Sequence, residues 1–360
     1  MRHKLKPLDQ QVIVITGASS GIGLSTARMA AKRGAKLVLA ARSDDALREL
    51  VKEIQKAGGR AVEVEVDVGS EAQVRRIADA AEREFGGFDT WVNNAGVSIY
   101  GESLDVATED MRRLFDTNFW GVVYGSRIAV EHLRRRGGAL INVGSQTSDK
   151  AAPLQAIYSA SKQAVKGWTD ALRMELEHQK APVSVTLVKP GPIDTPYTMH
   201  AKNYMPDQPK HVAPVYTPGS VAAAILYAAT TPVRDLYVGS IARMTPAMDY
   251  WAPRLSDKAF GSALISGTHS GRPRNEHEAL YKAGGELKER GDYPGMARPS
   301  ISSGASMHPV MAAAAAAGIG LIATALWRSA GNGEKHHREP REVWAELEEK
   351  RTATVTPPQL

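Results

Sequence analysis

The stretch that decides the expected fold is TGASSGIG, at residues 16–23 of a chain of 360 residues. It directly follows the apolar run 12–15 and opens a segment of helical character, which is the context that a phosphate-binding glycine turn requires. We expect Gly17 to permit the tight turn, Gly21 to let a pyrophosphate approach the backbone, and Gly23 to allow close packing of the helix. This spacing differs from the Gly-x-Gly-x-x-Gly dinucleotide fingerprint but puts the glycines to the same physical use.

Short β-branched or apolar runs alternate with helical segments on both sides of this turn. The predicted strands are residues 12–16, 36–40, 61–67, 90–93, 139–143, 184–189 and 236–239. The predicted helices are residues 23–33, 44–57, 71–85, 108–136, 157–179 and 221–229, with Ser43 and Ser70 as capping residues. This alternation is typical of a parallel sheet with helices on both faces. The sequence therefore predicts an α/β, Rossmann-like doubly wound sheet of seven parallel strands, followed by a C-terminal extension.

The composition excludes several classes of function. The chain has no cysteine, so disulfides, thiolate catalysis and cysteine-ligated metals are ruled out, and no cluster of histidines and carboxylates indicates a metal. The net charge of +6 comes from basic and acidic residues that are interspersed. The basic run 134–136 ends a predicted helix, where cations suit the helix dipole. We expect neither a metal nor a nucleic-acid partner.

The residues that follow the second strand indicate which nucleotide binds. An acidic residue there binds a free ribose 2′-hydroxyl and repels a 2′-phosphate, whereas this chain has Ala41 and Arg42. Because a guanidinium offers a planar fork of donors suited to phosphate, Arg42, with Ser19 and Ser43 as lesser partners, favours NADP(H) over NAD(H). The alternative is that Arg42 is a solvated loop residue.

The ends of the third and fourth strands supply further predicted contacts with the nucleotide. Asp67 and Val68 are placed to meet the adenine. In the sequence 93–96, small side chains leave room for a ribose, and we expect Asn93 to hold neighbouring strands together.

Tyr158 and Lys162 are the candidate acid–base pair. They lie four residues apart in a predicted helix, which places them on one face. An ammonium beside a phenol, together with a positively charged nicotinamide, stabilises the phenolate and lowers the phenol's pKa. Ser145, at the end of the fifth strand, can donate to the same substrate oxygen, and Asn118 can hold a water that passes protons to Lys162. Taken singly, each residue has a structural explanation, but together they indicate proton transfer to or from a carbonyl oxygen.

These motifs resemble those of the short-chain dehydrogenase/reductase family over residues 7–239. The resemblance implies that Asn118, Ser145, Tyr158 and Lys162 form a catalytic tetrad, and that Lys162 also bonds the nicotinamide ribose. It implies an enzyme that interconverts a ketone or aldehyde and an alcohol, and homodimers or homotetramers are common in the family. The nucleotide contacts expected from the motifs and the resemblance are Gly17, Ser19, Gly21, Ile22, Gly23, Arg42, Asp67, Val68, Asn94, Ala95, Gly96, Tyr158, Lys162, Pro190, Gly191, Ile193 and Thr195.

The segment 192–219 is predicted to be a mobile cover over the substrate. Six prolines interrupt any helix there, and Met199, Tyr204 and Met205 supply apolar surface, which favours a hydrophobic carbonyl or alcohol as substrate.

The rest of the chain is expected to form three pieces beyond a catalytic domain at 1–250. Residues 251–309 are predicted to be an irregular Gly-, Pro- and charge-rich extension, and 328–360 a charged tail. Residues 310–327 carry no charge and as a helix would span about 27 Å, which suits either a membrane anchor on a cytoplasmic enzyme or an Ala-rich helix packed on protein.

A non-catalytic NADP(H) sensor acting through the extension is the alternative function. An intact tetrad argues against it, because a sensor has no need of a Tyr and a Lys beside a positioned Ser.

Overall fold

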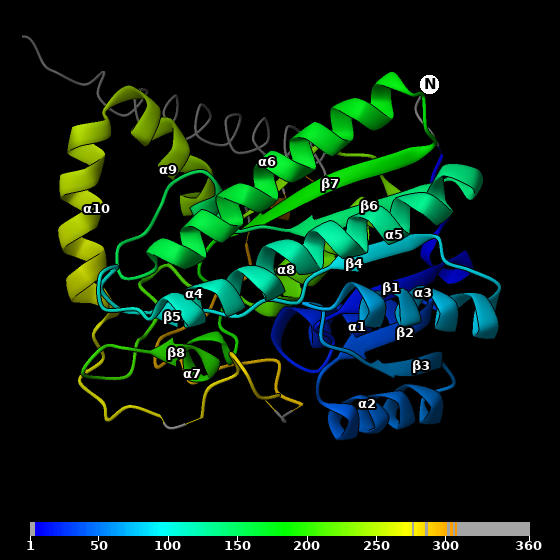
Figure 1. Ribbon diagram of the computed structural model, residues 1–360, viewed down its shortest axis with the longest axis horizontal. Coiled ribbons are helices and arrows are strands. Elements are labelled where there is room, and N and C mark those ends of the chain that lie inside the picture. The colour runs from blue at the N-terminus through cyan, green and yellow to red at the C-terminus, as the bar shows by residue number, and fades with distance from the viewer. Residues whose placement is uncertain (1–3, 276, 285–286, 301–302, 305–306, 308–360) are drawn as a thin grey trace, which may run out of the picture. The chain divides into compact units, whose positions relative to one another are not determined.

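A computed structural model shows the arrangement of the chain (Figure 1). It describes residues 4–275, 277–284, 287–300, 303–304 and 307. The chain divides into two compact units, Met1–Met307 and His308–Leu360, and the described residues all belong to the first. The predicted segments 310–327 and 328–360 therefore lie outside the described residues.

The first unit is built on a parallel sheet of seven strands in the order β3-β2-β1-β4-β6-β7-β9. The strands are β1 (Val12–Thr16), β2 (Lys36–Ala41), β3 (Arg60–Glu65), β4 (Thr90–Asn93), β6 (Gly138–Val143), β7 (Val183–Pro190) and β9 (Asp235–Val238). β1 pairs with β2 on one side and β4 on the other, so the strand order reverses beside β1. The predicted doubly wound sheet is confirmed, with strand ends within two residues of those expected.

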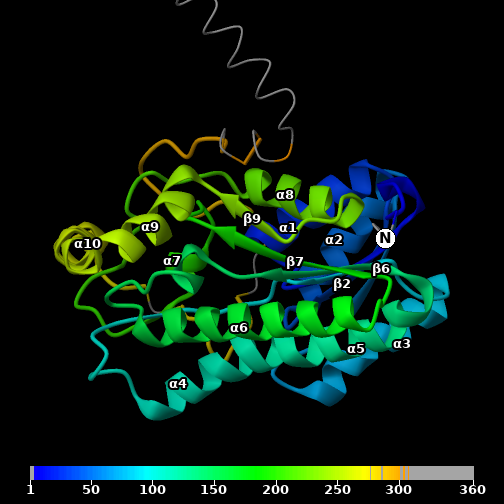
Figure 2. The ribbon, with the colours of Figure 1, turned by 90° about the horizontal axis from the view of Figure 1, so that it is seen from above.

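Helices cover both faces of this sheet (Figure 2). One layer holds α1 (Gly21–Lys32), α2 (Asp44–Lys56) and α8 (Pro218–Thr230), and the other holds α3 (Glu71–Phe85), α5 (Gly121–Arg136) and α6 (Ala156–His178). Ile13 and Ile15 of β1 pack into the first layer, whereas Val12 and Val14 pack into the second. Because successive side chains of a strand point to opposite faces, a strand covered on both sides is apolar throughout.

The predicted helix at 108–136 is divided in the structure. It consists of α4 (Thr108–Phe115), a π-helical turn η2 (Asp116–Trp120) and α5. Gly121, where α5 begins, packs so closely on Val68 that an added Cβ would lie 2.8 Å from its Cγ2 atom. The turn carries Asn118, and π turns of this kind occur frequently at functional sites.

Of two other local predictions, the one on helix capping needs correction and the one on Asn93 is confirmed. Ser43 and Ser70 precede α2 and α3, but neither side chain makes a capping hydrogen bond. Asn93 is structural as expected: it is buried, and its Nδ2 donates to Asn142 Oδ1 of the neighbouring strand at 2.9 Å.

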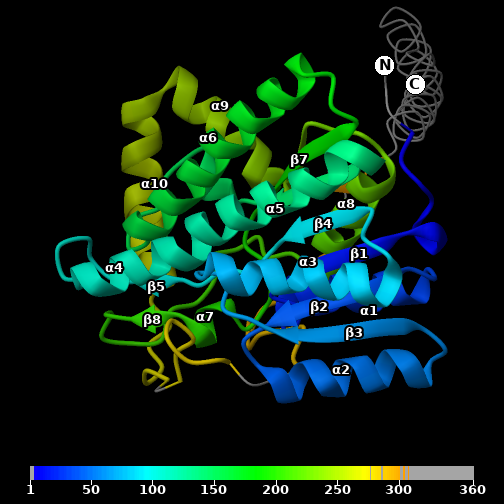
Figure 3. The same ribbon diagram turned by 45° about the vertical axis from the view of Figure 1, so that its right-hand side comes forward.

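The extension begins with two helices that the sequence analysis did not predict. These are α9 (Ser240–Trp251) and α10 (Pro253–Thr268), which lie near the end of the sheet where α4 and β5 lie (Figures 1 and 3). The helical pattern of these two sequences is hard to recognise because α9 contains Pro246. In addition, both helices expose large apolar side chains, such as Trp251 of α9 and Leu255 of α10. Lys150 anchors both, through Asp249 of α9 and Asp257 of α10, at 2.5 Å each. The sequence analysis predicts an irregular extension at 251–309, whereas α10 forms a regular helix within it.

The remaining elements are short. They are η1 (Leu8–Gln10), η3 (Gln146–Ser148), α7 (Tyr197–His200) and a two-stranded sheet of β5 (Ile99–Tyr100) and β8 (Lys202–Asn203). In the part of the chain that the structure describes, none of the helices combines the length and apolar character needed to cross a bilayer.

Candidate active site

The glycine turn between β1 and α1 has the geometry that its sequence predicts. Gly17 and Gly21 have φ angles of +68° and +52°, which L side chains rarely adopt. A Cβ at Gly23 would lie 2.0 Å from the Gly17 carbonyl oxygen, so the helix can approach the turn only without a side chain there. Asn94 fixes the turn to the next loop, because its Nδ2 donates to Thr16 O at 2.9 Å. This cradle of bare backbone fits a pyrophosphate.

A cavity of about 330 Å³ lies at the carboxyl ends of the strands. Its size is within the range of ligand-binding cavities. It brings together nearly every nucleotide-binding or catalytic residue predicted from the sequence. Gly23 and Asn118 are the exceptions, because neither lines the cavity. The predicted residues that do line it are Gly17, Ser19, Gly21, Ile22, Arg42, Asp67, Val68, Asn94, Ala95, Gly96, Ser145, Tyr158, Lys162, Pro190, Gly191, Ile193 and Thr195.

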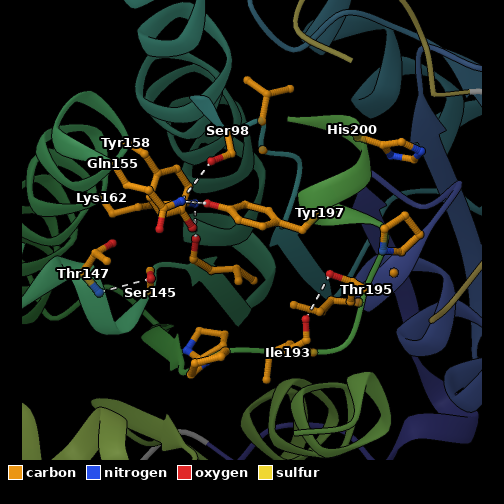
Figure 4. A pocket seen from close by; sticks show the side chains of 18 of the residues that line it. Ser98, Ser145, Thr147, Gln155, Tyr158, Lys162, Ile193, Thr195, Tyr197 and His200 are labelled. Atoms are coloured by element: carbon orange, nitrogen blue, oxygen red, sulfur yellow. Dashed lines mark hydrogen bonds between the residues drawn. The ribbon is translucent and has the colours of Figure 1, made fainter. Parts of the chain in front are cut away.

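Ser145, Tyr158 and Lys162 converge on one part of the cavity (Figure 4). Ser145 follows β6, and its Oγ accepts a hydrogen bond from Thr147 N at 3.1 Å, which fixes the side chain and leaves its own hydrogen to donate. The side chains of Ser145 and Tyr158 both line this part of the cavity. Lys162, one helical turn further along α6, is buried and donates from Nζ to the Val143 carbonyl at 3.0 Å. A phenol, a hydroxyl and an amine therefore share one desolvated site.

The electrostatics of this site differ from the expectation. Burial raises the pKa of Tyr158, although hydrogen bonds from Tyr197 and Ser145 oppose that rise. Burial also lowers the pKa of Lys162 to about 8, so the amine is mostly charged at neutral pH. Its Nζ lies 5.8 Å from the Tyr158 ring centroid. The lowered phenol pKa that the sequence analysis expects from Lys162 is therefore not produced by the residues of the chain alone.

Asn118 ties the π turn to its surroundings instead of facing the cavity. Its Oδ1 accepts from Val97 N at 2.8 Å, and its Nδ2 donates to Val97 O at 3.0 Å and Ser161 Oγ at 3.2 Å. Both amide hydrogens are thus used, and one lone pair of Oδ1 remains for a relay water. The side chain can position α6, and with it Tyr158 and Lys162, more directly than it can pass protons.

A second tyrosine next to Tyr158 was missed by the sequence analysis. Tyr197, at the start of α7, packs against Tyr158 with ring centroids 5.5 Å apart. Its hydroxyl accepts from Gln155 Nε2 at 2.8 Å, and the same amide donates to Ser98 Oγ at 3.1 Å (Figure 4). Burial raises the pKa of Tyr197 well above its usual value, so it acts as a neutral hydroxyl beside Tyr158.

The predicted cover, residues 192–219, does lie over the cavity, but with other side chains than expected. Tyr197, His200 and His211 line the cavity, whereas Met199, Tyr204 and Met205 do not. Met205 is buried in a separate apolar cluster, and the Tyr204 hydroxyl donates to Asp110 at 2.7 Å. These apolar residues bury the cover's own face and so carry no information about the substrate.

Part of the extension, here called the strap (residues 277–284 and 287–291), crosses the nucleotide end of the cavity. Ala279, Ala283 and Gly284 line the cavity, and the side chain of Leu280 is fully buried in the apolar cluster that contains Tyr158. At the glycine turn, Lys288 O accepts from Gly21 N at 2.9 Å. No pattern in the sequence predicts these contacts, because the strap has neither helical nor strand periodicity.

Arg42 lies where the sequence analysis placed it, at the end of β2 and in the cavity wall. Its guanidinium donates to the carbonyl oxygens of Ala279 and Leu280, the latter at 3.1 Å. It is therefore not a solvated loop residue.

Comparison with known proteins agrees with this geometry. The family model for short chain dehydrogenases matches residues 11–205. The uncharacterized oxidoreductase YxnA of Bacillus subtilis (strain 168) is 51% identical over 322 residues, which cover 88% of this chain and 90% of that protein.

Two solved structures share the fold. A short chain dehydrogenase/reductase from Burkholderia phymatum in complex with NAD has a TM-score of 0.63 and 27% identity, over 70% of this chain and 96% of that one. An alcohol dehydrogenase from the archaeon Thermococcus sibiricus complexed with 5-hydroxy-NADP has a TM-score of 0.56 and 25% identity, over 63% and 95% of the two chains. The chain belongs to the short-chain dehydrogenase/reductase family and is an oxidoreductase of alcohols and carbonyl compounds.

Proposed function

We propose that the chain interconverts an apolar ketone or aldehyde and its alcohol with NADP(H), with Tyr158 as the general acid and base. In the reducing direction, the Tyr158 hydroxyl gives its proton to the carbonyl oxygen while Ser145 donates a hydrogen bond to the same atom. The bound nicotinamide would supply the hydride to the carbonyl carbon. The observation that carries the proposal is that Ser145, Tyr158 and Lys162 line one cavity, with Lys162 one helical turn from Tyr158 on α6.

The neighbouring residues position this pair. Lys162 has two hydrogens left after its bond to Val143 O, and they suit the hydroxyls of a nicotinamide ribose. Asn118 holds α6 in register with the π turn through Ser161. The cavity wall beside them includes Ile241 of α9 and Phe260 and Leu264 of α10. Because these side chains are apolar, they favour a substrate whose body beyond the carbonyl is apolar as well.

The preference for NADP(H) rests on Arg42. The residue directly after β2 is Arg42 and not a carboxylate. The Arg42 side chain is held in the cavity wall by two carbonyl oxygens, and it has no ion pair of its own among the described residues. A 2′-phosphate can take part in charge-assisted hydrogen bonds with such a group. Membrane association through residues 310–327 and a homodimeric or homotetrameric state stay predictions.

Tyr158→Phe tests the catalytic role. The variant keeps the ring and its packing but removes the proton, so we expect turnover of ketones to fall at least about 100-fold while NADPH still binds, as measured by fluorescence titration. Tyr227→Phe, which removes a phenol hydroxyl far from the cavity, serves as the control. Undiminished turnover by the Tyr158 variant would show that another group is the acid. Tight nucleotide binding by the wild type without turnover of any ketone or aldehyde would favour the redox sensor instead.

Arg42→Asp tests the cofactor preference. It removes a phosphate partner and adds a repulsive charge, so we expect the ratio of NADPH affinity to NADH affinity to fall by about two orders of magnitude. Equal ratios in variant and wild type would rule out Arg42 as the 2′-phosphate ligand.

A further inference from the structure

A second arginine contacts Asp67 in the cavity wall without lining the cavity itself, and the function proposed above does not use it. Arg113, on α4, donates from Nη2 to Asp67 Oδ2 and from Nε to the Leu280 carbonyl at 3.2 Å. The same Leu280 oxygen accepts from Arg42 Nη1 at 3.1 Å. One carbonyl of the strap therefore holds two guanidinium groups side by side, and the Asp67 carboxylate is ion-paired with only one of them, Arg113.

The acidic groups near these arginines are already paired. Burial by itself would raise the pKa of Asp67, but hydrogen bonds from Arg113 and from Gly69 N outweigh it, so the carboxyl has a lowered pKa and is ionised. Glu278, on the strap, lies 3.8 Å from Lys202 Nζ. Each of these carboxylates is ion-paired with another cation, so Arg42 lines the cavity without an ion pair of its own among the described residues.

We propose that Arg113 is a specificity-determining residue for a nucleotide with a 2′-phosphate, because it neutralises Asp67 and, through the Leu280 carbonyl, fixes Arg42 beside it. This inference rests on the NADP(H) preference proposed above. Asp67 lies in the same cavity wall as Arg42, so its charge, once unpaired, repels a 2′-phosphate and competes with it for Arg42. NADH carries a neutral hydroxyl at that position, so it does not experience this repulsion.

The strap makes the arrangement depend on the extension. Leu280 is fully buried against Val97 and Leu114, and the Tyr281 hydroxyl donates to Asp110 Oδ1 at 2.7 Å, so the backbone between them is fixed at both sides of the Leu280 carbonyl. Arg42 follows β2 and Arg113 lies on α4. Without the strap, no shared contact would couple the rotamers of the two side chains. The strap thus contributes to nucleotide selection without providing a side chain to the nucleotide.

Arg113→Met is the test, with two readouts for NADPH and for NADH: KM, and Kd from fluorescence titration without a carbonyl substrate. We expect KM for NADPH to rise about tenfold and KM for NADH to change less than twofold. Adding Asp67→Asn should return the KM ratio to within about threefold of the wild-type value, because the unpaired charge is then gone. Arg112→Met, the exposed neighbour on the same helix, removes the same net charge and should leave the ratio unchanged.

The outcomes separate this inference from the function on which it rests. Equal rises in both KM values for Arg113→Met, or failure of Asp67→Asn to restore the ratio, would assign Arg113 a merely structural role while the NADP(H) preference stands. A wild-type enzyme that does not prefer NADPH would overturn both proposals. A ratio that falls with Arg113→Met and recovers in the double variant supports the inference, and a loss of folding cannot produce that recovery.

Discussion

Gly23→Ala is the substitution whose cost follows most directly from the structure. An added Cβ would lie 2.0 Å from Gly17 O and 2.7 Å from Asn94 Nδ2. Neither atom can move away cheaply, because Gly17 is backbone in a left-handed conformation and Asn94 is bonded to Thr16 O. Overpacking of this kind costs roughly 1–3 kcal/mol or more, and the better helix propensity of alanine returns at most about 1 kcal/mol. We expect a net loss of about 2 kcal/mol in the free energy of unfolding.

Thermal unfolding followed by circular dichroism measures this loss. At about 2–4 °C per kcal/mol for a unit of this size, Tm should fall by about 5 °C, and affinity for both nucleotides should fall with it because the turn is displaced. Gly167→Ala is the matched control: Gly167 lies in α6 with nothing within 4 Å of an added Cβ, so the same substitution there should raise stability by about 0.5–1 kcal/mol. A Gly23→Ala variant as stable as the wild type would refute the close-packing role of Gly23.

Two further substitutions test burial in the site. Because the pKa of Lys162 is lowered from 10.5 to about 8, the unfolded chain binds one more proton than the folded chain between those pH values. The free energy of unfolding of the wild type, relative to that of Lys162→Met, should therefore rise with pH through this window by up to about 3 kcal/mol. Urea midpoints at pH 7.5 and pH 10 would measure this rise. A difference between the two proteins that does not vary with pH would contradict the burial of the Lys162 amine. Leu280→Ala should release the strap, because a buried leucine contributes about 2–5 kcal/mol, and hydrogen exchange of residues 277–284 should quicken while affinity for both nucleotides falls. Unchanged exchange would mean that the strap is held by its polar contacts instead.

Much of the candidate site could be predicted from the sequence because its signals are local. Gly17, Gly21 and Gly23 lie within one turn, and Tyr158 and Lys162 lie within one turn of helix, so spacing alone places them. The strands were equally easy to predict, since a strand buried on both faces is a short apolar run in the sequence. The carboxyl ends of parallel strands share one edge of the sheet, which is why residues from six strands were expected to meet, and they do line one cavity.

What the sequence by itself determined is therefore the doubly wound sheet, the glycine turn and the placement of Tyr158 and Lys162 on one helix. Only the tertiary structure decided the rest: Tyr197 beside Tyr158, Arg113 on Asp67, and the strap on Arg42. Arg42 and Leu280 are separated by 238 residues, and the strap's hydrogen bonds come from irregular backbone with no repeating pattern of side chains. Contacts of that kind depend on how the whole chain packs, so no spacing rule within the sequence can reveal them.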